Sequence, residues 1–174
     1  MILIIDFGSQ YNQLIARRVR EHQVYCRIEP PDLPLSAIRA MAPEGIILSG
    51  GPASIYAAGA PRADRGIFEL GIPVLGICYG LQFMADALGG RVVGSAKREY
   101  GFAELSIKKQ KGLFSGVQRK TPCWMSHGDA IGELPPGFSV TASTANTKVA
   151  AAEDAKRRFY GLQFHPEVVH TREG

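Results

Sequence analysis

Short apolar segments alternate with helix-like segments through the first 90 residues of the chain. The strand-like segments are residues 2–5, 24–28, 45–48 and 73–77, and the segments with helical spacing are residues 10–21, 36–41, 63–70 and 79–88. Short apolar segments bounded by turn residues are typical of buried strands. Their alternation with helices predicts a parallel sheet covered by helices on both faces.

The second half of the chain has a different pattern of predicted elements. Short strand-like segments separated by turns occupy residues 102–107, 122–125, 139–143, 148–152 and 158–163. Such a succession favours hairpins and antiparallel strands. We therefore expect an α/β fold with a doubly wound, mostly parallel sheet, helices on both faces and antiparallel additions in the C-terminal half. Because no low-complexity linker interrupts the chain, residues 1–174 are expected to form a single domain.

Charge and composition argue against several function classes. The net charge is only +4, and the densest basic clusters, residues 108–111 and 156–158, are not interleaved with aromatic residues as a nucleic-acid platform would be. No apolar run approaches the roughly 18 residues of a membrane-spanning helix. The apolar N-terminal run ends at Asp6 and lacks a basic leader, so it does not resemble a signal peptide. We therefore expect neither a nucleic-acid nor a membrane partner.

The three cysteines, Cys26, Cys78 and Cys123, have no paired spacing. An odd number of cysteines without such spacing argues for a reducing compartment, so a cytoplasmic protein is expected. There is no CxxC or HxxxH pair, and no metal site is expected. Cys26 and Cys123 lie in strand-like segments and are interpreted as inert core residues.

Cys78 differs from the other cysteines because of the turn in which it lies. Gly76 and Gly80 flank it at a distance of two residues, between an apolar strand and a helix. This is the nucleophile-elbow pattern G-x-S-x-G with cysteine in place of serine. The glycines are needed because the turn is strained and side chains there would collide. The elbow places the sulfur at the carboxyl edge of the sheet, next to the positive N-terminus of a helix.

A cysteine nucleophile needs a general base and a partner that orients the base. His165 follows the last strand-like segment and would therefore leave the same edge of the sheet as the nucleophile. Pro166 favours an extended backbone at His165. Glu167, two residues beyond the histidine, can accept a hydrogen bond from the imidazole. His22, at the end of a polar helix face, is expected to be solvated.

Two segments resemble the class I, or triad, glutamine amidotransferases: Gly-Ile-Cys-Tyr-Gly-Leu-Gln at 76–82 and Gln-Phe-His-Pro-Glu at 163–167. The resemblance extends over nearly the whole chain. It implies a triad of Cys78, His165 and Glu167, in which the cysteine attacks the side-chain amide of glutamine, ammonia leaves, and water hydrolyses the thioester. His165 would transfer the proton and Glu167 would hold the imidazole.

The same resemblance implies the groups that bind the substrate. The glycine turn at 49–52 corresponds to the loop that supplies one backbone donor of the oxyanion hole, from Gly51, and the second donor would be the N–H of Tyr79. Gln82 matches the family glutamine that contacts the substrate. Four residues would form the loop around the α-amino and α-carboxylate groups: Ser126, His127, Gly128 and Asp129. His127 could also be interpreted as a second base.

Within this family, the chain is most similar to the amidotransferase domains of GMP synthases. The similarity lies in residues 4–11, 14–20, 47–52, 98–101 and 124–129. It implies that the ammonia aminates ATP-activated xanthosine monophosphate on an ATP-pyrophosphatase synthetase domain or subunit. No P-loop pattern is present, so ATP and Mg²⁺ are expected on that partner and no cofactor is expected here. The final helix and the synthetase portion would lie outside residues 1–174.

Three other functions remain open. The chain could be a binding module that is silent until a partner assembles its oxyanion hole, or the amidotransferase of another biosynthetic synthetase. It could also be a stand-alone γ-glutamyl peptidase on the same elbow. The resemblance of residues 124–129 argues against the peptidase, because a loop that closes on free α-amino and α-carboxyl groups would exclude a peptide.

Overall fold

The structure is a computed structural model of the 174-residue chain, and it describes residues 1–94 and 99–174. Arg98, one of the residues that carry the resemblance above, lies outside the described residues. The elements in chain order are β1 (Ile2–Ile5), α1 (Asn12–Glu21), β2 (Cys26–Glu29), α2 (Leu35–Met41), β3 (Gly45–Leu48), η1 (Arg65–Glu69), β4 (Val74–Ile77), α3 (Tyr79–Ala87), β5 (Arg91–Ile107), η2 (Gly112–Phe114), β6 (Lys120–Glu133), β7 (Ser139–Ser143), β8 (Ala151–Asp154) and β9 (Phe159–Leu162).

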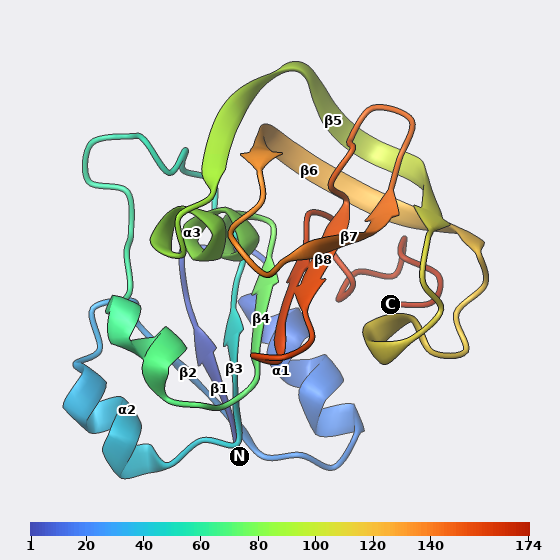
Figure 1. Ribbon diagram of the computed structural model, residues 1–174. Coiled ribbons are helices and arrows are strands. Elements are labelled where there is room, and N and C mark those ends of the chain that lie inside the picture. The colour runs from blue at the N-terminus through green and yellow to red at the C-terminus, as the bar shows by residue number, and fades with distance from the viewer.

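The strands form one mixed sheet in the order β2-β1-β3-β4-β9-β8-β7-β5-β6 (Figure 1). β2, β1, β3, β4 and β9 pair in parallel, and the remaining pairs are antiparallel. The expected α/β fold, with a parallel core and antiparallel additions, is therefore confirmed. The carboxyl ends of β3, β4 and β9 lie side by side, and this edge is where open α/β sheets bind ligands.

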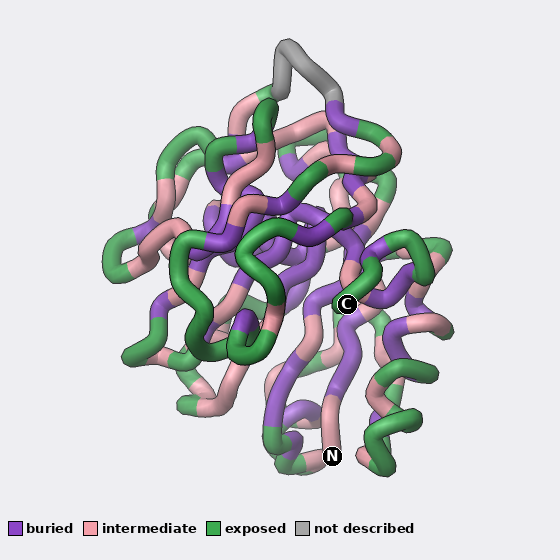
Figure 2. The backbone as a smooth tube through the Cα atoms, turned by 90° about the vertical axis from the view of Figure 1, so that its right-hand side faces the viewer, coloured by how far each residue is buried: buried purple, intermediate pink, exposed green. Residues whose placement is uncertain are grey.

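Alternating side chains of the central strands enter two different cores. On β1, Leu3 and Ile5 pack with residues of α2, η1 and α3, whereas Ile4 packs on the opposite face with Ile15 of α1. This alternation follows from the two-residue period of a strand. Helices therefore cover both faces of the sheet (Figure 1), and the buried residues run through the middle of the molecule (Figure 2).

The structure differs from three local expectations. The helix expected at 63–70 is only the short 3₁₀ helix η1, in which the side chain of Asp64 caps the N–H of Gly66 at 2.8 Å. The strands expected at 102–107 and 122–125 are parts of a much longer hairpin, β5 and β6, which rises above the helices in Figure 1. Residues 126–129, expected in a loop, lie within β6, near an irregularity in its pairing with β5.

Two further findings concern membranes and metals. Within the described part of the chain, every helix is too short or too polar to cross a membrane. Among the same residues, no group of three or more His, Cys, Asp and Glu side chains gathers as metal ligands do.

Candidate active site

Cys78 lies in a sharp turn between the end of β4 and the start of α3. Its backbone has φ 50° and ψ −107°, a strained conformation for a residue other than glycine that costs about 1–3 kcal/mol. The flanking glycines make room for this turn. A Cβ at Gly76 would lie 2.6 Å from the backbone nitrogen of Leu81, and one at Gly80 would collide with the carbonyl group of Leu48. The local sequence therefore permits the elbow that it predicts.

The sulfur of Cys78 is buried among polar groups from other segments. The backbone N–H of Cys78 donates to the carbonyl oxygen of Leu162 at 2.7 Å, which ties the elbow to β9. The Sγ atom lies 3.4 Å from the carbonyl oxygen of Ser126, and the side-chain amide of Gln163 donates to it at 3.7 Å. The sulfur also lies at the N-terminus of α3, where the helix dipole favours a negative charge.

His165 and Glu167 form a buried pair beyond the end of β9. The Nδ1 atom of His165 lies 2.8 Å from Oε1 of Glu167, and both residues are less than 5% exposed. The backbone of His165 is held by Trp124, which accepts its N–H at 3.0 Å, and by Thr171, whose hydroxyl donates to its carbonyl at 2.6 Å. Arg18 of α1 donates to the carbonyl oxygen of Glu167 at 3.1 Å. The orientation of the imidazole is thus fixed from several sides.

These contacts determine the charge of His165. Burial lowers the pKa of the imidazole, but its hydrogen bonds with Cys78 and Glu167, together with their negative charge, raise it further, to about 10 from the ordinary value of 6.5. The ring is therefore protonated at neutral pH. A protonated imidazole beside a cysteine sulfur is the arrangement in which a thiolate can act as a nucleophile.

The N–H of Tyr79 points out of the start of α3. The first hydrogen bond of this helix runs from the N–H of Gln82 to the carbonyl oxygen of Cys78, at 3.1 Å. The N–H groups before Gln82 therefore belong to the first turn, where a helix offers its donors no intrahelical partner. The Tyr79 donor is adjacent to the sulfur-bearing residue, as an oxyanion hole requires.

The N–H of Gly51 belongs to a peptide group that is packed against the cysteine and histidine. A Cβ at Gly50 would lie 3.1 Å from Cε1 of His165 and 3.7 Å from Cβ of Cys78. The hydroxyl of Ser49 donates to the carbonyl oxygen of Gly50 at 2.8 Å. Because the carbonyl and N–H of a trans peptide point in opposite directions, the N–H of Gly51 faces away from Ser49.

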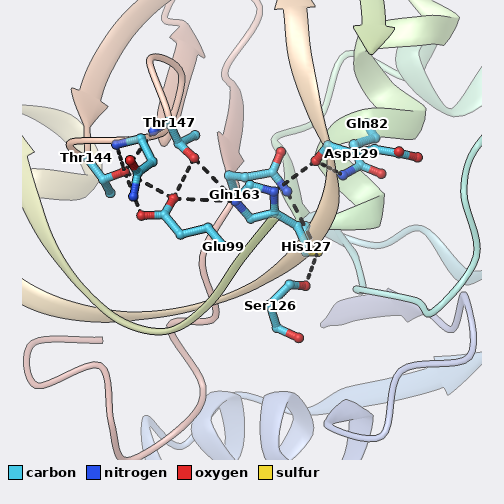
Figure 3. Close-up of polar contacts among 10 residues, drawn as sticks. Gln82, Glu99, Ser126, His127, Asp129, Thr144, Thr147 and Gln163 are labelled. Carbon is cyan, nitrogen blue, oxygen red and sulfur yellow. Dashed lines mark hydrogen bonds and ion pairs between the residues drawn. The ribbon is translucent and has the colours of Figure 1, made fainter. Parts of the chain in front are cut away.

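A cavity opens beside Cys78, and its lining contains six residues that the family resemblance named for substrate or oxyanion binding: Gly51, Gln82, Ser126, His127, Gly128 and Asp129. Inside it, the amide of Gln82 donates to the carbonyl oxygen of Asp129 at 3.1 Å, and Nδ1 of His127 lies 2.9 Å from the same oxygen (Figure 3). Burial lowers the pKa of His127. Both ring nitrogens of His127 face protein partners, which favours a lining or structural role over that of a second base.

Sequence reasoning missed several residues that hold the site. Gln163 had a usable signal, because it precedes His165 by two residues in an extended segment and such residues share a side. Trp124 had no sequence signal, because it holds His165 through its backbone carbonyl, which any residue has. The contacts of Arg18 and Thr171 link segments that are 149 and 6 residues apart and follow no pattern. His22, by contrast, is exposed as expected.

The comparisons with known proteins agree with this geometry. The glutamine amidotransferase class-I family model matches residues 3–174. A curated "GMP synthase [glutamine-hydrolyzing]" of Heliobacterium modesticaldum is 54% identical over 173 residues, which cover 99% of this chain and 34% of that protein. The protein of the same name from Nitrosococcus oceani is 56% identical over 181 residues, with the same coverage. The chain thus spans about a third of the length of these relatives.

Solved structures show the same fold. The crystal structure of a "putative gmp synthase subunit a protein" from Thermoplasma acidophilum has a TM-score of 0.89 and 33% identity, and the match covers 98% of this chain and 86% of that one. A glutamine amidotransferase from Thermotoga maritima has a TM-score of 0.80 at 22% identity, covering 96% and 76%. The chain therefore belongs to the class-I glutamine amidotransferase family.

Proposed function

We propose that this chain is the glutamine-hydrolysing part of a GMP synthase, and that Cys78, His165 and Glu167 release ammonia from L-glutamine. The observation that carries the proposal is the buried His165–Glu167 pair beside a cysteine held in a strained turn, at the mouth of a polar cavity. The names of the relatives, which match 99% of the chain, support it.

In the first half-reaction, the Cys78 thiolate attacks the side-chain amide carbon of glutamine. The carbon–sulfur bond forms as the carbonyl π-electrons move to oxygen. When the tetrahedral intermediate collapses, the carbon–nitrogen bond breaks and protonated His165 gives its Nε2 proton to the leaving nitrogen. Ammonia departs and a glutamyl thioester remains on Cys78. Glu167 keeps the imidazole in place by accepting the Nδ1–H bond throughout.

In the second half-reaction, water hydrolyses the thioester. His165, now neutral, takes a proton from the attacking water as general base. The carbon–oxygen bond forms, the carbon–sulfur bond breaks, and glutamate leaves with the thiolate restored. In both steps negative charge develops on the carbonyl oxygen, and the N–H groups of Tyr79 and Gly51 are the donors that would stabilise it. Removal of one such donor typically costs about 10²–10³-fold in rate.

The cavity beside Cys78 would hold glutamine with its amide at the sulfur and its α-amino and α-carboxylate groups against residues 126–129. Gln82 would contact the bound substrate from α3. The Asp129 carboxylate and the backbone N–H groups of this segment are the kinds of groups that bind an ammonium and a carboxylate. This mode of binding would favour free glutamine over γ-glutamyl peptides.

The ammonia would aminate ATP-activated xanthosine monophosphate on an ATP-pyrophosphatase domain or subunit. The relatives are about three times as long as this chain, which leaves room for such a synthetase portion. ATP and Mg²⁺ would bind there, and this chain would need no cofactor of its own. The reaction would take place in the cytoplasm, consistent with three free cysteines.

The direct test is glutamate release from glutamine by the purified chain, alone and with an ATP-pyrophosphatase partner that is loaded with ATP and xanthosine monophosphate. The Cys78→Ala variant should release none. Cys123→Ala is the matched control, because burial and the charge of Glu99 raise the pKa of the Cys123 thiol to about 12 and leave it unreactive.

Four outcomes separate the candidate functions and test the proposed nucleophile. Release that depends on Cys78 and rises with the loaded partner would support the proposal. Release only in the presence of the partner would favour the module that is silent alone. Equal turnover of γ-glutamyl peptides would favour the peptidase, and turnover retained by Cys78→Ala would exclude the proposed nucleophile.

A further inference from the structure

A buried chain of polar side chains connects β5 to the cavity beside Cys78. Glu99 accepts hydrogen bonds from the hydroxyl of Thr144 at 3.1 Å and from that of Thr147 at 2.6 Å. Nε2 of His127 lies 3.4 Å from the Thr147 hydroxyl and 3.8 Å from Glu99. Nδ1 of the same ring lies 2.9 Å from the carbonyl oxygen of Asp129. Figure 3 shows that these contacts form one continuous network.

The network ties four separate parts of the chain together. Glu99 belongs to β5, His127 and Asp129 to β6, and Thr147 to the turn before β8. The amide of Gln82 adds α3, because it donates to the same Asp129 oxygen at 3.1 Å. Glu99, His127 and Thr147 are each at least 91% buried. A buried polar network of this kind favours a single arrangement of the segments that it joins.

The chemistry of the groups gives the network a direction. A carbonyl oxygen only accepts hydrogen bonds, so Nδ1 of His127 must carry the hydrogen toward Asp129. Nε2 lies within hydrogen-bond distance of the Thr147 hydroxyl, which can donate to this nitrogen or accept from it, whereas a ring carbon could do neither. The Thr147 oxygen and the Glu99 carboxylate together form a polar cradle around Nε2. A flipped ring would place a carbon atom in this cradle and another against the Asp129 oxygen, so the cradle selects the observed orientation.

We propose that Thr147 and Glu99 are positioning residues for glutamine binding. They hold His127 with its Nδ1–H on the Asp129 carbonyl, and through it they shape residues 126–129 and Gln82 around the substrate. This inference rests on the proposed function, because it takes the cavity beside Cys78 to be the glutamine site.

The nucleophile itself is held by other contacts. The backbone of Cys78 is bonded to Leu162, and His165 is held by Glu167, Trp124 and Thr171. None of these bonds runs through Glu99 or Thr147, and Cys78 meets the segment that the network shapes through a contact between its Sγ atom and the backbone carbonyl oxygen of Ser126. Loss of the network should therefore weaken the binding of glutamine and leave the intrinsic reactivity of Cys78 unchanged. A general loss of structure would instead reduce both.

The experiment measures alkylation of Cys78 by iodoacetamide, which lacks α-amino and α-carboxylate groups, and protection of Cys78 by increasing concentrations of glutamine. The variants are Thr147→Val, which removes the hydroxyl at constant shape, and Glu99→Gln, which removes the charge. Thr147→Ser restores the hydroxyl. Thr121→Val is the matched control, since Thr121 is also buried and its hydroxyl has no partner among the described residues.

The glutamine concentration that gives half protection should rise about tenfold in Thr147→Val, as expected for one lost buried hydrogen bond. It should rise in Glu99→Gln as well, and stay within about twofold of the native value in Thr147→Ser and Thr121→Val. The rate of alkylation without glutamine should stay within about twofold in all four variants.

Unchanged protection in both Thr147→Val and Glu99→Gln would overturn the inference and leave the proposed function standing. An equal loss of Cys78 alkylation and of protection by glutamine would also overturn the inference, because that pattern indicates a structural role. If glutamine failed to protect Cys78 in the native chain, both the glutamine site and this inference would be refuted.

Discussion

Replacement of Glu167 by glutamine removes one buried charge and little else. In the native chain, the Glu167 carboxylate accepts the Nδ1–H of His165 at 2.8 Å, and neither side chain is more than 5% exposed. Glutamine keeps the shape and an accepting oxygen, so the ring orientation should survive. A hydrogen bond to a charged group contributes about 1.5–3 kcal/mol and a neutral one about 1 kcal/mol, so the exchange costs about 0.5–2 kcal/mol. Glutamine hydrolysis by Glu167→Gln should therefore fall roughly 2- to 30-fold.

The same substitution should change how stability depends on pH. The pKa of His165 is raised to about 10 in the folded chain, from an ordinary value of 6.5. A group whose folded pKa is raised stabilises the fold fully below its unfolded pKa, and this contribution is lost as the pH rises through the folded pKa. Native stability should therefore decline between pH 6.5 and about 10. Without the carboxylate, one cause of the raised pKa is gone, so the decline should be smaller and should end at a lower pH.

The assay is urea unfolding across this pH range, paired with glutamine hydrolysis at neutral pH. The control variant is Glu69→Gln, which makes the same chemical change at an exposed residue. Superimposable pH profiles for Glu167→Gln and the native chain would refute the assigned cause of the raised pKa of His165. Unchanged hydrolysis would refute the orienting role of Glu167.

Three further substitutions test the elbow and the base. Cys78→Gly should abolish hydrolysis yet raise the free energy of unfolding by about 1 kcal/mol, because glycine adopts φ 50° without strain. A urea midpoint below that of the native chain would contradict the claim that the Cys78 backbone is strained. Gly80→Ala should lower the free energy of unfolding by about 2 kcal/mol or more, since its Cβ would overlap the Leu48 carbonyl, and unchanged unfolding would show that the helix can shift. His165→Ala should reduce hydrolysis by several orders of magnitude, because triad members act as a unit; a loss of less than tenfold, measured as glutamate release, would remove His165 from the mechanism.

The parallel half of the fold was predictable because its signals are local. The apolar run of β1 and the helical spacing of α1 each occupy consecutive residues, and right-handed βαβ connections leave few ways to arrange them. The elbow was predictable for the same reason, since Gly76 and Gly80 make the Cys78 turn sterically possible. His165 and Glu167 lie where a residue leaving β9 should lie, and their catalytic roles remain predictions.

The length of the β5–β6 hairpin was underestimated because much of it does not face the core. Tyr100 is 63% exposed, and the parts of β5 and β6 outside the expected strands, residues 91–101 and 126–133, lack the apolar alternation that marks a half-buried strand. Residues 126–129 were expected in a loop because of the family resemblance, and their glycine and polar residues give no strand signal. In the structure they pair with β5, which a single strand's pattern does not reveal.

The polar network behind the cavity could not be predicted at all. Glu99 and Thr147 are 48 residues apart in the chain, and the resemblance carried by residues 98–101 assigns Glu99 no role. Their interaction depends on how the hairpin and the turn before β8 meet in space. Burial alone distinguishes them from the many surface residues of the same kind.

The central claim is that glutamine becomes covalently attached to Cys78. The most direct measurement is mass spectrometry of the chain, quenched in acid during turnover of glutamine with the loaded synthetase partner and digested to peptides. The proposed mechanism predicts a glutamyl group on the peptide that contains Cys78, which disappears when turnover ends and never forms in Cys78→Ala. Glutamate release without any such adduct, and equally fast in Cys78→Ala, would contradict it.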